Sequence, residues 1–353
     1  MVQAERDGYL KKVLVTGGAG FFGLHLSRNL LDRGCTVRIL DCADLDNPAL
    51  EGKVEFIKGD ILDPAAVGTA ATGVDAVIHN AAVVPISRSG KRFWTVNVDG
   101  TRNVLTHAEK AGVKKLVYIS SSSAYGIPEK IPIDESVPLN PFGKYGTSKA
   151  AGEKICEEFK SRMDISIIRP RTILDEGRLG VQQILFDWVK KGKNFYIFGK
   201  GDNRFQLVSA KDLAEACCLT LEKSCRGEDF NIGAQEFTTL RGDLEGFVTN
   251  AGTKTKIVSV PTRPARAVLQ VLDFLRISPF VDYHYYILSH DVWFDTKKAE
   301  TMLGWKAKDS NIDMLTRAYT WYLAHEKELD KEVGTTHRKK VKLGIVKLVK
   351  WIS

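Results

Sequence analysis

Short apolar runs alternate with amphipathic stretches through the first half of the chain. Strands are predicted at the run that begins at Lys12 and near residues 36–40, 54–58, 75–79, 115–120 and 165–169. Helices are predicted between them, as at 98–111 and 144–161. This alternation is typical of an α/β fold, a doubly wound parallel sheet covered on both faces. After about Pro170 the alternation becomes irregular, and a smaller α/β subdomain that binds the substrate is expected there.

The first apolar run enters a turn in which Gly17, Gly20 and Gly23 are three residues apart. A strand-to-helix turn without side chains lets a pyrophosphate reach the backbone N–H groups of a helix N-terminus. A turn that only packs a helix on a sheet has the same pattern, but here an acid, Asp41, ends the second strand. Its carboxylate would bind ribose hydroxyls and repel a 2′-phosphate, which favours NAD over NADP.

Tyr145 and Lys149 stand four residues apart at the start of a predicted helix and therefore share one face. A phenol is a poor base near neutral pH, but a neighbouring ammonium favours its phenolate form. Such a pair suits the removal of a proton from an alcohol that loses a hydride. The pair follows the strand at 115–120, and ligands of parallel sheets bind beyond the strand ends.

Composition excludes several other classes of protein. The 353 residues are 44% apolar and 27% charged, no stretch is long enough to span a bilayer, and residues 1–11 lack a secretory signal, so a cytoplasmic protein is expected. The six cysteines and seven histidines show no metal-ligand spacing, which predicts reduced thiols and no metal site. Six of the eight net positive charges come from residues 337–353, so the globular part is not expected to bind nucleic acid.

The ordered set of motifs resembles the extended short-chain dehydrogenase/reductases, in the NAD-dependent epimerase/dehydratase group. The matching segments are 16–23, 59–63, 79–82, 97–101, 120–126, 145–149 and 168–170. The resemblance covers roughly residues 10–325. It implies a Rossmann-type NAD-binding domain, a substrate-binding subdomain and a homodimer. The NAD-binding domain would be formed by 1–169 with returning segments near 205–235 and 286–297, and the subdomain by 170–204, 236–285 and 298–336.

The resemblance also implies roles for individual residues. Tyr145 would be the base, and Lys149 would favour its phenolate and hold the nicotinamide ribose. Ser121 would bind the reacting oxygen, with Ser122 as the second choice. The implied cofactor contacts are Gly17, Gly20, Phe21, Phe22, Gly23, Asp41, Asp60, Ile61, Asn80, Ala81, Ala82, Asn97, Tyr145, Lys149 and Pro170.

The residues expected on the substrate side exclude some of the reactions known in the group. Dehydratases and decarboxylases of the group carry acids after the catalytic hydroxyl, whereas this chain has Ser122 and Ser123, which leaves epimerisation or dehydrogenation. Arg204 falls where nucleotide-sugar epimerases hold the diphosphate, a task that suits a guanidinium, and Arg178 is a second candidate. The expected substrate contacts are Ser121, Ser122, Thr172, Arg178 and Arg204.

Three functions therefore compete. A nucleotide-sugar epimerase is favoured by the motifs. The apolar stretch at 261–279 is similar to the related 3β-hydroxysteroid dehydrogenases and favours a lipid-alcohol dehydrogenase, although such a stretch also suits a core or a dimer face. A non-catalytic NAD-binding regulator fits poorly with the intact pair of Tyr145 and Lys149, because a sensor needs no base.

The C-terminal tail has a separate pattern. Between Val341 and Ile352, apolar residues fall on one side of a helical projection and lysines on the rest. A basic amphipathic helix suits a membrane surface, so peripheral membrane contact through 338–352 is predicted. A helix docked on the protein itself or on a partner subunit, and a disordered basic tail, are the alternatives.

Overall fold

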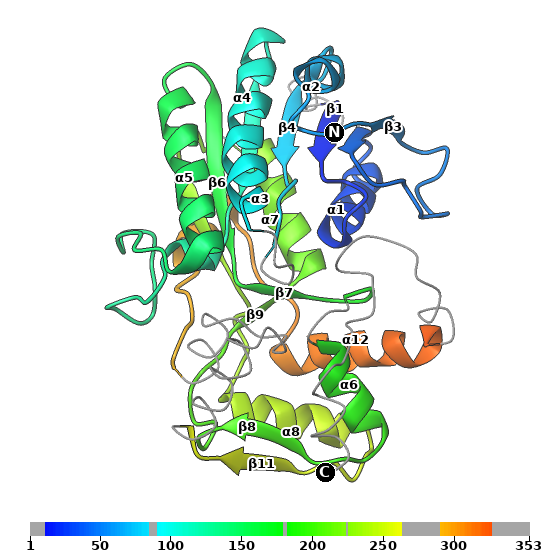
Figure 1. Cartoon of the computed structure of the whole chain (residues 1–353), viewed down its shortest axis with the longest axis vertical. Helices are drawn as coiled ribbons and strands as arrows, with labels where there is room; N and C mark the ends of the chain where they lie inside the picture. The colour runs from blue at the N-terminus through cyan, green and yellow to red at the C-terminus, as the bar shows by residue number, and fades with distance from the viewer. Residues whose placement is uncertain (1–10, 85–89, 179–181, 224, 263–289, 327–353) are drawn as a thin grey trace, which may run out of the picture.

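The computed structural model describes residues 11–84, 90–178, 182–223, 225–262 and 290–326. Figure 1 shows two parts, a large parallel sheet between two layers of helices and a smaller lobe of helices and short strands below it. The α/β fold predicted from the sequence is confirmed, and it places one end of the large sheet beside the smaller lobe.

The large sheet has seven strands, and every neighbouring pair is parallel. In spatial order they are β10 (Asp229–Ile232), β6 (Asp164–Pro170), β5 (Lys115–Ile119), β4 (Ala76–His79), β1 (Lys12–Thr16), β2 (Thr36–Asp41) and β3 (Glu55–Lys58). The direction of winding reverses between β1 and β4. Open parallel sheets bind their ligands beyond the strand ends at such a switch point.

Two hydrophobic clusters cover the two faces of the sheet. Val13 and Val15 of β1 belong to one cluster and Leu14 to the other, because successive strand residues point to opposite faces. The first face is packed by α1 (Phe21–Asp32), α7 (Ala210–Glu222) and α11 (Lys297–Leu303). The second is packed by α2 (Pro64–Ala71), α4 (Thr101–Lys110) and α5 (Gly143–Phe159).

The helix predicted at 98–111 differs from the structure at its start. The α-helix α4 begins only at Thr101, and it follows a short helical turn, α3 (Arg92–Trp94), and a π-helical segment, η1 (Thr95–Gly100). π-helical turns are rare and often occur at functional sites. Here the wide turn contains Asn97, whose side chain reaches Val83 and Ser148.

The smaller lobe has a core of its own. Its helices are α6 (Gln182–Lys190), α8 (Leu240–Asn250) and α12 (Asn311–His325). Two parallel pairs of short strands accompany them, β8 (Phe195–Phe198) with β11 (Ile257–Val260) and β7 (Thr172–Leu174) with β9 (Leu207–Ser209). A capping box formed by Ser310 and Asp313 fixes the start of α12.

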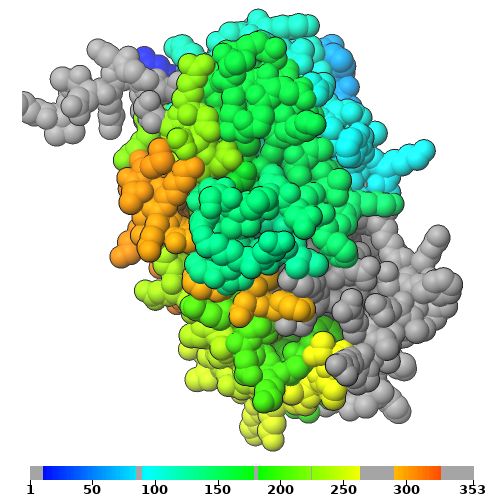
Figure 2. Space-filling model, turned by 90° about the vertical axis from the view of Figure 1, so that its left-hand side faces the viewer, coloured from blue at the N-terminus to red at the C-terminus, as the bar shows by residue number. Residues whose placement is uncertain are grey.

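Long-range contacts join the two parts. The backbone N–H of Ile133 donates to the carbonyl of Trp293, and that of Val292 donates to the carbonyl of Arg204. In Figure 2 the segment around 291–296 accordingly lies between the loop that follows β5 and the smaller lobe. Residues from three distant parts of the sequence therefore meet at the junction.

The sequence also led to expectations about the cysteines, metal sites, membrane-spanning segments and the C-terminal tail. The six cysteines all lie in the described residues and form no disulfide there, and five of them are buried. In the described ranges, no cluster of His, Cys, Asp and Glu is arranged to hold a metal ion, and no helix is both long and apolar enough to cross a bilayer. The tail at 337–353 and most of the apolar stretch at 261–279 lie outside the described residues.

Candidate functional site

The glycine turn brings the start of α1 against two strand ends. Gly17 has φ of 70°, and a methyl group there would lie 2.7 Å from Cα of Ala81. A methyl group on Gly23 would overlap the carbonyl oxygen of Gly17. The helix begins after Gly20 with no side-chain cap and no acidic residue in its first turn. Its N–H groups and positive dipole end are therefore arranged to receive an anion, which fits the pyrophosphate of NAD.

Asp41 lies at the same turn. Its Oδ2 accepts a hydrogen bond from the backbone N–H of Ala19 at 2.9 Å, and its Oδ1 accepts one from that of Ala43 at 2.9 Å. Burial raises the pKa of this carboxyl, and the two backbone donors oppose the rise. The acid at the end of β2 is thus held in a fixed position against the turn, where the sequence predicted a contact with ribose.

The end of β4 is tied to the glycine turn. The side-chain amide of Asn80 donates to the carbonyl of Gly17 at 3.1 Å, and the N–H of Ala81 donates to Oγ1 of Thr16 at 3.2 Å. Ala82 follows them in the chain, and the predicted adenine contacts, Asp60 and Ile61, follow β3. The structure therefore gathers the predicted cofactor residues of β1, β2, β3 and β4 at one end of the sheet.

The predicted catalytic pair lies on α5, close to the end of β5. Nζ of Lys149 donates to the carbonyl of Ile119 at 2.6 Å and lies 4.4 Å from the centre of the Tyr118 ring. Burial lowers the pKa of Lys149 to about 8, against the opposing charge of Glu153. Methyl groups on Gly146 and Gly152 would overlap Ser123 and Tyr118, so these glycines allow the close approach of helix and strand.

Exposure separates the serines after β5. Ser120, Ser122 and Ser123 are 3%, 8% and 4% exposed, whereas Ser121 is only partly buried. Oγ of Ser121 accepts a hydrogen bond from the N–H of Ser123 at 3.1 Å and caps the 3-10 turn η2 (Ser122–Ala124). Because its hydroxyl proton is left to donate elsewhere, Ser121 suits contact with a ligand better than Ser122 does.

Asn97 joins the cofactor end of the sheet to the catalytic helix. It exchanges hydrogen bonds with the backbone of Val83 at 2.7 and 3.0 Å, and its amide donates to Oγ of Ser148 at 3.0 Å. Ser148 in turn donates to the carbonyl of Tyr145 at 2.8 Å. Asn97 is 1% exposed, so its predicted cofactor role would be indirect, through the segments that it holds.

The two predicted phosphate-binding arginines lie in different places. The Arg204 guanidinium packs against two rings that touch each other, 4.7 Å from the centre of Phe237 and 4.6 Å from that of Trp293, and the residue is exposed. Arg178 lies 5.2 Å from the centre of the Phe21 ring, beside the glycine turn. The structure does not bring the two arginines together, and it places Arg178 on the cofactor side.

Arg178 has an unusual environment for a cation. Its Nε is buried and has no hydrogen-bond partner among the described residues. Burial lowers the pKa of the guanidinium to about 10, and Tyr145 is the ionisable group that opposes this shift. A guanidinium with a buried Nε, and with no carboxylate paired to it among the described residues, favours the binding of an anion.

Pro170 and Thr172 mark the passage from the sheet to the smaller lobe. Pro170 ends β6 opposite Ile232, and Thr172 begins β7 opposite Leu207. Both lie on the backbone that leads from the cofactor end of the sheet toward Arg178. Thr172 is only partly buried, which leaves it open to the role in substrate binding that the sequence predicted.

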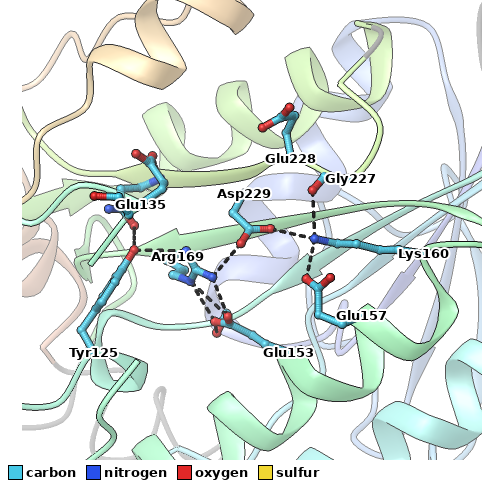
Figure 3. Close-up of polar contacts among 12 residues, drawn as sticks. Tyr125, Glu135, Glu153, Glu157, Lys160, Arg169, Gly227, Glu228 and Asp229 are labelled. Atoms are coloured by element: carbon cyan, nitrogen blue, oxygen red, sulfur yellow. Dashed lines mark hydrogen bonds and ion pairs between the residues drawn. The ribbon is translucent and has the colours of Figure 1, made fainter. Parts of the chain in front are cut away.

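The sequence did not reveal two features of the site. One is the pair of rings around Arg204, since Phe237 and Trp293 are distant in the chain and follow no local pattern. The other is a buried ionic cluster beside α5 that centres on Glu153 and Arg169 (Figure 3). Its one local signal is the spacing of Glu153, which stands four residues after Lys149 and so extends the same helix face.

Comparison with known proteins shows the family and the fold of the chain. The chain matches the model of the NAD dependent epimerase/dehydratase family over residues 13–233. It is 40% identical to the uncharacterized protein y4nG of Sinorhizobium fredii, over 96% of this chain and 86% of that protein. It is 30% identical to a UDP-glucose 4-epimerase of Lactobacillus helveticus, over 90% of this chain and 98% of that protein. The structure of a UDP-glucose 4-epimerase of Thermotoga maritima, solved with UDP-glucose, has the same fold, with a TM-score of 0.75. The two sequences are 24% identical, and the match covers 89% of this chain and 99% of that one.

Proposed function

This chain belongs to the NAD-dependent epimerase/dehydratase family and is an NAD-dependent enzyme, and from that premise we propose that it is a nucleotide-sugar epimerase. The observation that supports the proposal most is the placement of α5, on which Lys149 donates to the carbonyl of Ile119 at the end of β5, two residues before the partly buried Ser121. The glycine turn lies at the same end of the sheet. The similarity to a UDP-glucose 4-epimerase supports the choice of a nucleotide sugar over other alcohols.

The residues of α5 and β5 would act on one secondary hydroxyl of the sugar. Tyr145, as its phenolate, would take the hydroxyl proton onto Oη while the carbon loses a hydride. Bound NAD supplies the acceptor for that hydride. The ammonium of Lys149 would stabilise the phenolate, and the Ser121 hydroxyl would donate a hydrogen bond to the reacting oxygen. Epimerisation then returns the proton from Tyr145 when the hydride is delivered to the other face of the ketone.

Two features favour a substrate that carries phosphate. Arg204 is exposed and packs against the rings of Phe237 and Trp293, which would leave its N–H groups available to a diphosphate. Holding the sugar through its diphosphate would leave the ring free to turn between the two hydride transfers. Arg178, buried beside Phe21, supplies a second positive charge on the cofactor side.

The other finer assignments rest on the sequence. Asp41 would select NAD by repelling a 2′-phosphate, and Ser122 and Thr172 remain predicted substrate contacts. The homodimer and the membrane contact of residues 338–352 also stay predictions. The apolar stretch that favoured a 3β-hydroxysteroid or lipid-alcohol dehydrogenase lies mostly outside the described residues, so no described feature favours that alternative.

Ligand-induced stabilisation tests the substrate class. The NAD complex is heated in the presence of nucleotide sugars, the matching free sugars, or sterols. A ligand that binds only the folded chain at a concentration 100 times its Kd adds about 2.7 kcal/mol of stability. We expect nucleotide sugars to raise the unfolding temperature and free sugars to have no effect. Stabilisation by sterols alone would overturn the proposal in favour of a lipid-alcohol dehydrogenase.

A further inference from the structure

A buried carboxylate beside the catalytic helix has an unusually complete set of partners. Both oxygens of Glu153 accept hydrogen bonds from the Arg169 guanidinium, at 3.0 and 3.1 Å from Nε and at 2.7 Å from Nη2 (Figure 3). The hydroxyl of Ser120 also donates to Oε1. All three residues are buried: the exposed fractions are 3% for Glu153, 4% for Arg169 and 3% for Ser120. Glu153 and Arg169 therefore form an interior ion pair in which both carboxylate oxygens accept hydrogen bonds.

These contacts join the three segments that carry the proposed site. Ser120 directly precedes Ser121 at the end of β5, and Arg169 directly precedes Pro170 at the end of β6. Glu153 itself lies one helical turn beyond Lys149 on α5. One carboxylate therefore fixes the spacing between the base, the hydroxyl that binds the reacting oxygen and the strand end beside the cofactor.

A second layer of groups holds Arg169 in place. Its Nη2 donates to Oδ2 of Asp229 at 2.8 Å, and its Nη1 donates to Oη of Tyr125 at 3.1 Å. Burial lowers the pKa of Arg169, but hydrogen bonds with Glu153 and the charge of that residue outweigh burial and raise it. The guanidinium is thus permanently charged, and its direction toward Glu153 is fixed from β10 and from the segment after β5.

Glu153 is also the counter-charge for Lys149. The groups that interact with Lys149 are Tyr118 from β5, His79 from β4, and Glu153 and Cys156 from α5. Burial lowers the pKa of His79 to about 3 and raises the pKa values of Tyr118 and Cys156 well above their usual range, so all three are neutral near pH 7. Among the described residues of this group, the negative charge that opposes the desolvation of Lys149 comes from Glu153.

We propose that Glu153 is a positioning residue for the reaction: it stands one turn from Lys149 on α5, supplies the negative charge on that side of the ammonium, and holds the ends of β5 and β6 against the helix. It touches neither substrate nor cofactor. The inference rests on the proposed function, because it assigns Glu153 a task in a reaction that Tyr145 and Lys149 perform.

The decisive change is Glu153→Gln, which keeps the shape of the side chain and removes its charge. Lys149 then loses its counter-charge and releases its proton at a lower pH, since an opposite charge nearby stabilises an ammonium by about 1–3 pKa units. A neutral lysine no longer favours the phenolate. We therefore expect the alkaline limb of the pH profile for kcat to move to lower pH, with little change in KM for the nucleotide sugar.

Glu157→Gln is the matched control. Glu157 is on the same helix one turn further on, its side chain is 55% exposed, and it pairs at 2.5 Å with Lys160, whose side chain is 17% exposed. Glu157→Gln removes one negative charge from the same residue type on the same helix as Glu153→Gln. Glu157, however, does not contact Arg169 or Ser120. We expect its pH profile and its Lys149 titration to match those of the unaltered chain.

The direct readout is the titration of Lys149 in the chain labelled with 13C at lysine Cε, followed by NMR. The signal is assigned by its loss in Lys149→Met. We expect a midpoint near the value of about 8 in the unaltered chain and a fall of about one unit or more in Glu153→Gln. An unchanged midpoint in a folded Glu153→Gln variant overturns the proposal.

Two further measurements keep the test decisive. If Glu153→Gln alone does not fold, the double variant Glu153→Gln with Arg169→Gln removes both buried charges and is titrated in the same way. The midpoint is again expected to fall, because the negative charge of Glu153 that opposes the desolvation of Lys149 is lost. An unchanged midpoint there also overturns the proposal. The titration needs no substrate, so it is independent of the proposed epimerase activity. If the unaltered chain shows no turnover but its lysine midpoint still depends on Glu153, the proposed function fails and the role of Glu153 toward Lys149 does not.

Discussion

Replacement of Gly23 by Ala tests the cofactor site at the point where the packing is tightest. A Cβ atom there would lie 2.5 Å from Cα of Gly18 and 2.8 Å from its carbonyl carbon, and it would overlap the carbonyl oxygen of Gly17. Carbon atoms in contact prefer about 3.5–4.0 Å. The start of α1 must therefore move away from the glycine turn by about 1 Å.

The expected loss falls on cofactor binding more than on folding. We assign the pyrophosphate to the N–H groups at the start of α1, and hydrogen bonds to a charged group are worth about 1.5–3 kcal/mol each. Loss of two such bonds would cost about 3–6 kcal/mol, which raises the Kd for NAD by about 10²–10⁴-fold. For stability, the overpacking cost of about 1–3 kcal/mol is partly offset by the preference of about 1 kcal/mol for Ala over Gly in a helix.

Gly34→Ala is the matched control just beyond the other end of α1. Gly34 has φ of 82°, and a Cβ atom there would have no neighbour within 4 Å. The change should cost about 1–2 kcal/mol of stability through the left-handed backbone alone and leave NAD affinity intact. Calorimetric titration with NAD and thermal unfolding of both variants give the comparison. A folded Gly23→Ala variant with the NAD affinity of the unaltered chain would refute the assignment of the pyrophosphate to this turn.

Three other substitutions test the remaining roles. Tyr145→Phe should lower kcat by about 10²–10⁴-fold, while its NAD affinity measured by calorimetry stays unchanged. Lys149→Met should lower both kcat and NAD affinity. Near-normal turnover by Tyr145→Phe would reject Tyr145 as the base. The unaltered chain should bind NAD more tightly than NADP, and Asp41→Ala should narrow that gap; equal affinities in the unaltered chain would remove the role given to Asp41. Arg204→Ala should raise KM for a nucleotide sugar by about 10–100-fold with kcat retained. The control Arg226→Ala, at another exposed arginine, should change neither KM nor kcat. An unaltered KM in Arg204→Ala would argue against binding of a diphosphate by that side chain.

The fold was predictable because its signals are local. The strands β1, β4, β5 and β6 are short apolar runs buried on both faces, and the glycine spacing at Gly17, Gly20 and Gly23 indicates a strand-to-helix turn. The edge strand β10 was not predicted. The helix face that carries Tyr145 and Lys149 follows from the four-residue spacing alone. The start of α4 was less predictable, because the π-helical turn around Asn97 depends on contacts with Val83 and Ser148, which are far away in the chain or on another helix.

The substrate side was harder to predict because its geometry depends on distant segments. Arg178 and Arg204 are both arginines near glycines in the sequence. In the structure, Arg178 lies on Phe21 of the cofactor turn and Arg204 packs against Phe237 and Trp293. The contacts of Glu153 with Ser120 and Arg169 also join separate elements. Period and spacing describe one element at a time, so they cannot reveal which side chains meet when the elements pack.

Turnover of a panel of nucleotide sugars with a trace of NAD tests the proposed function most directly. The sugar is followed by proton NMR and the nicotinamide by its absorbance in the same sample. We expect one nucleotide sugar to be converted to its epimer over many turnovers for each NAD, with no accumulation of reduced cofactor, and we expect this conversion to be lost in Tyr145→Phe. Accumulation of reduced cofactor in proportion to a ketone product, with no epimer, would contradict the account and identify a dehydrogenase.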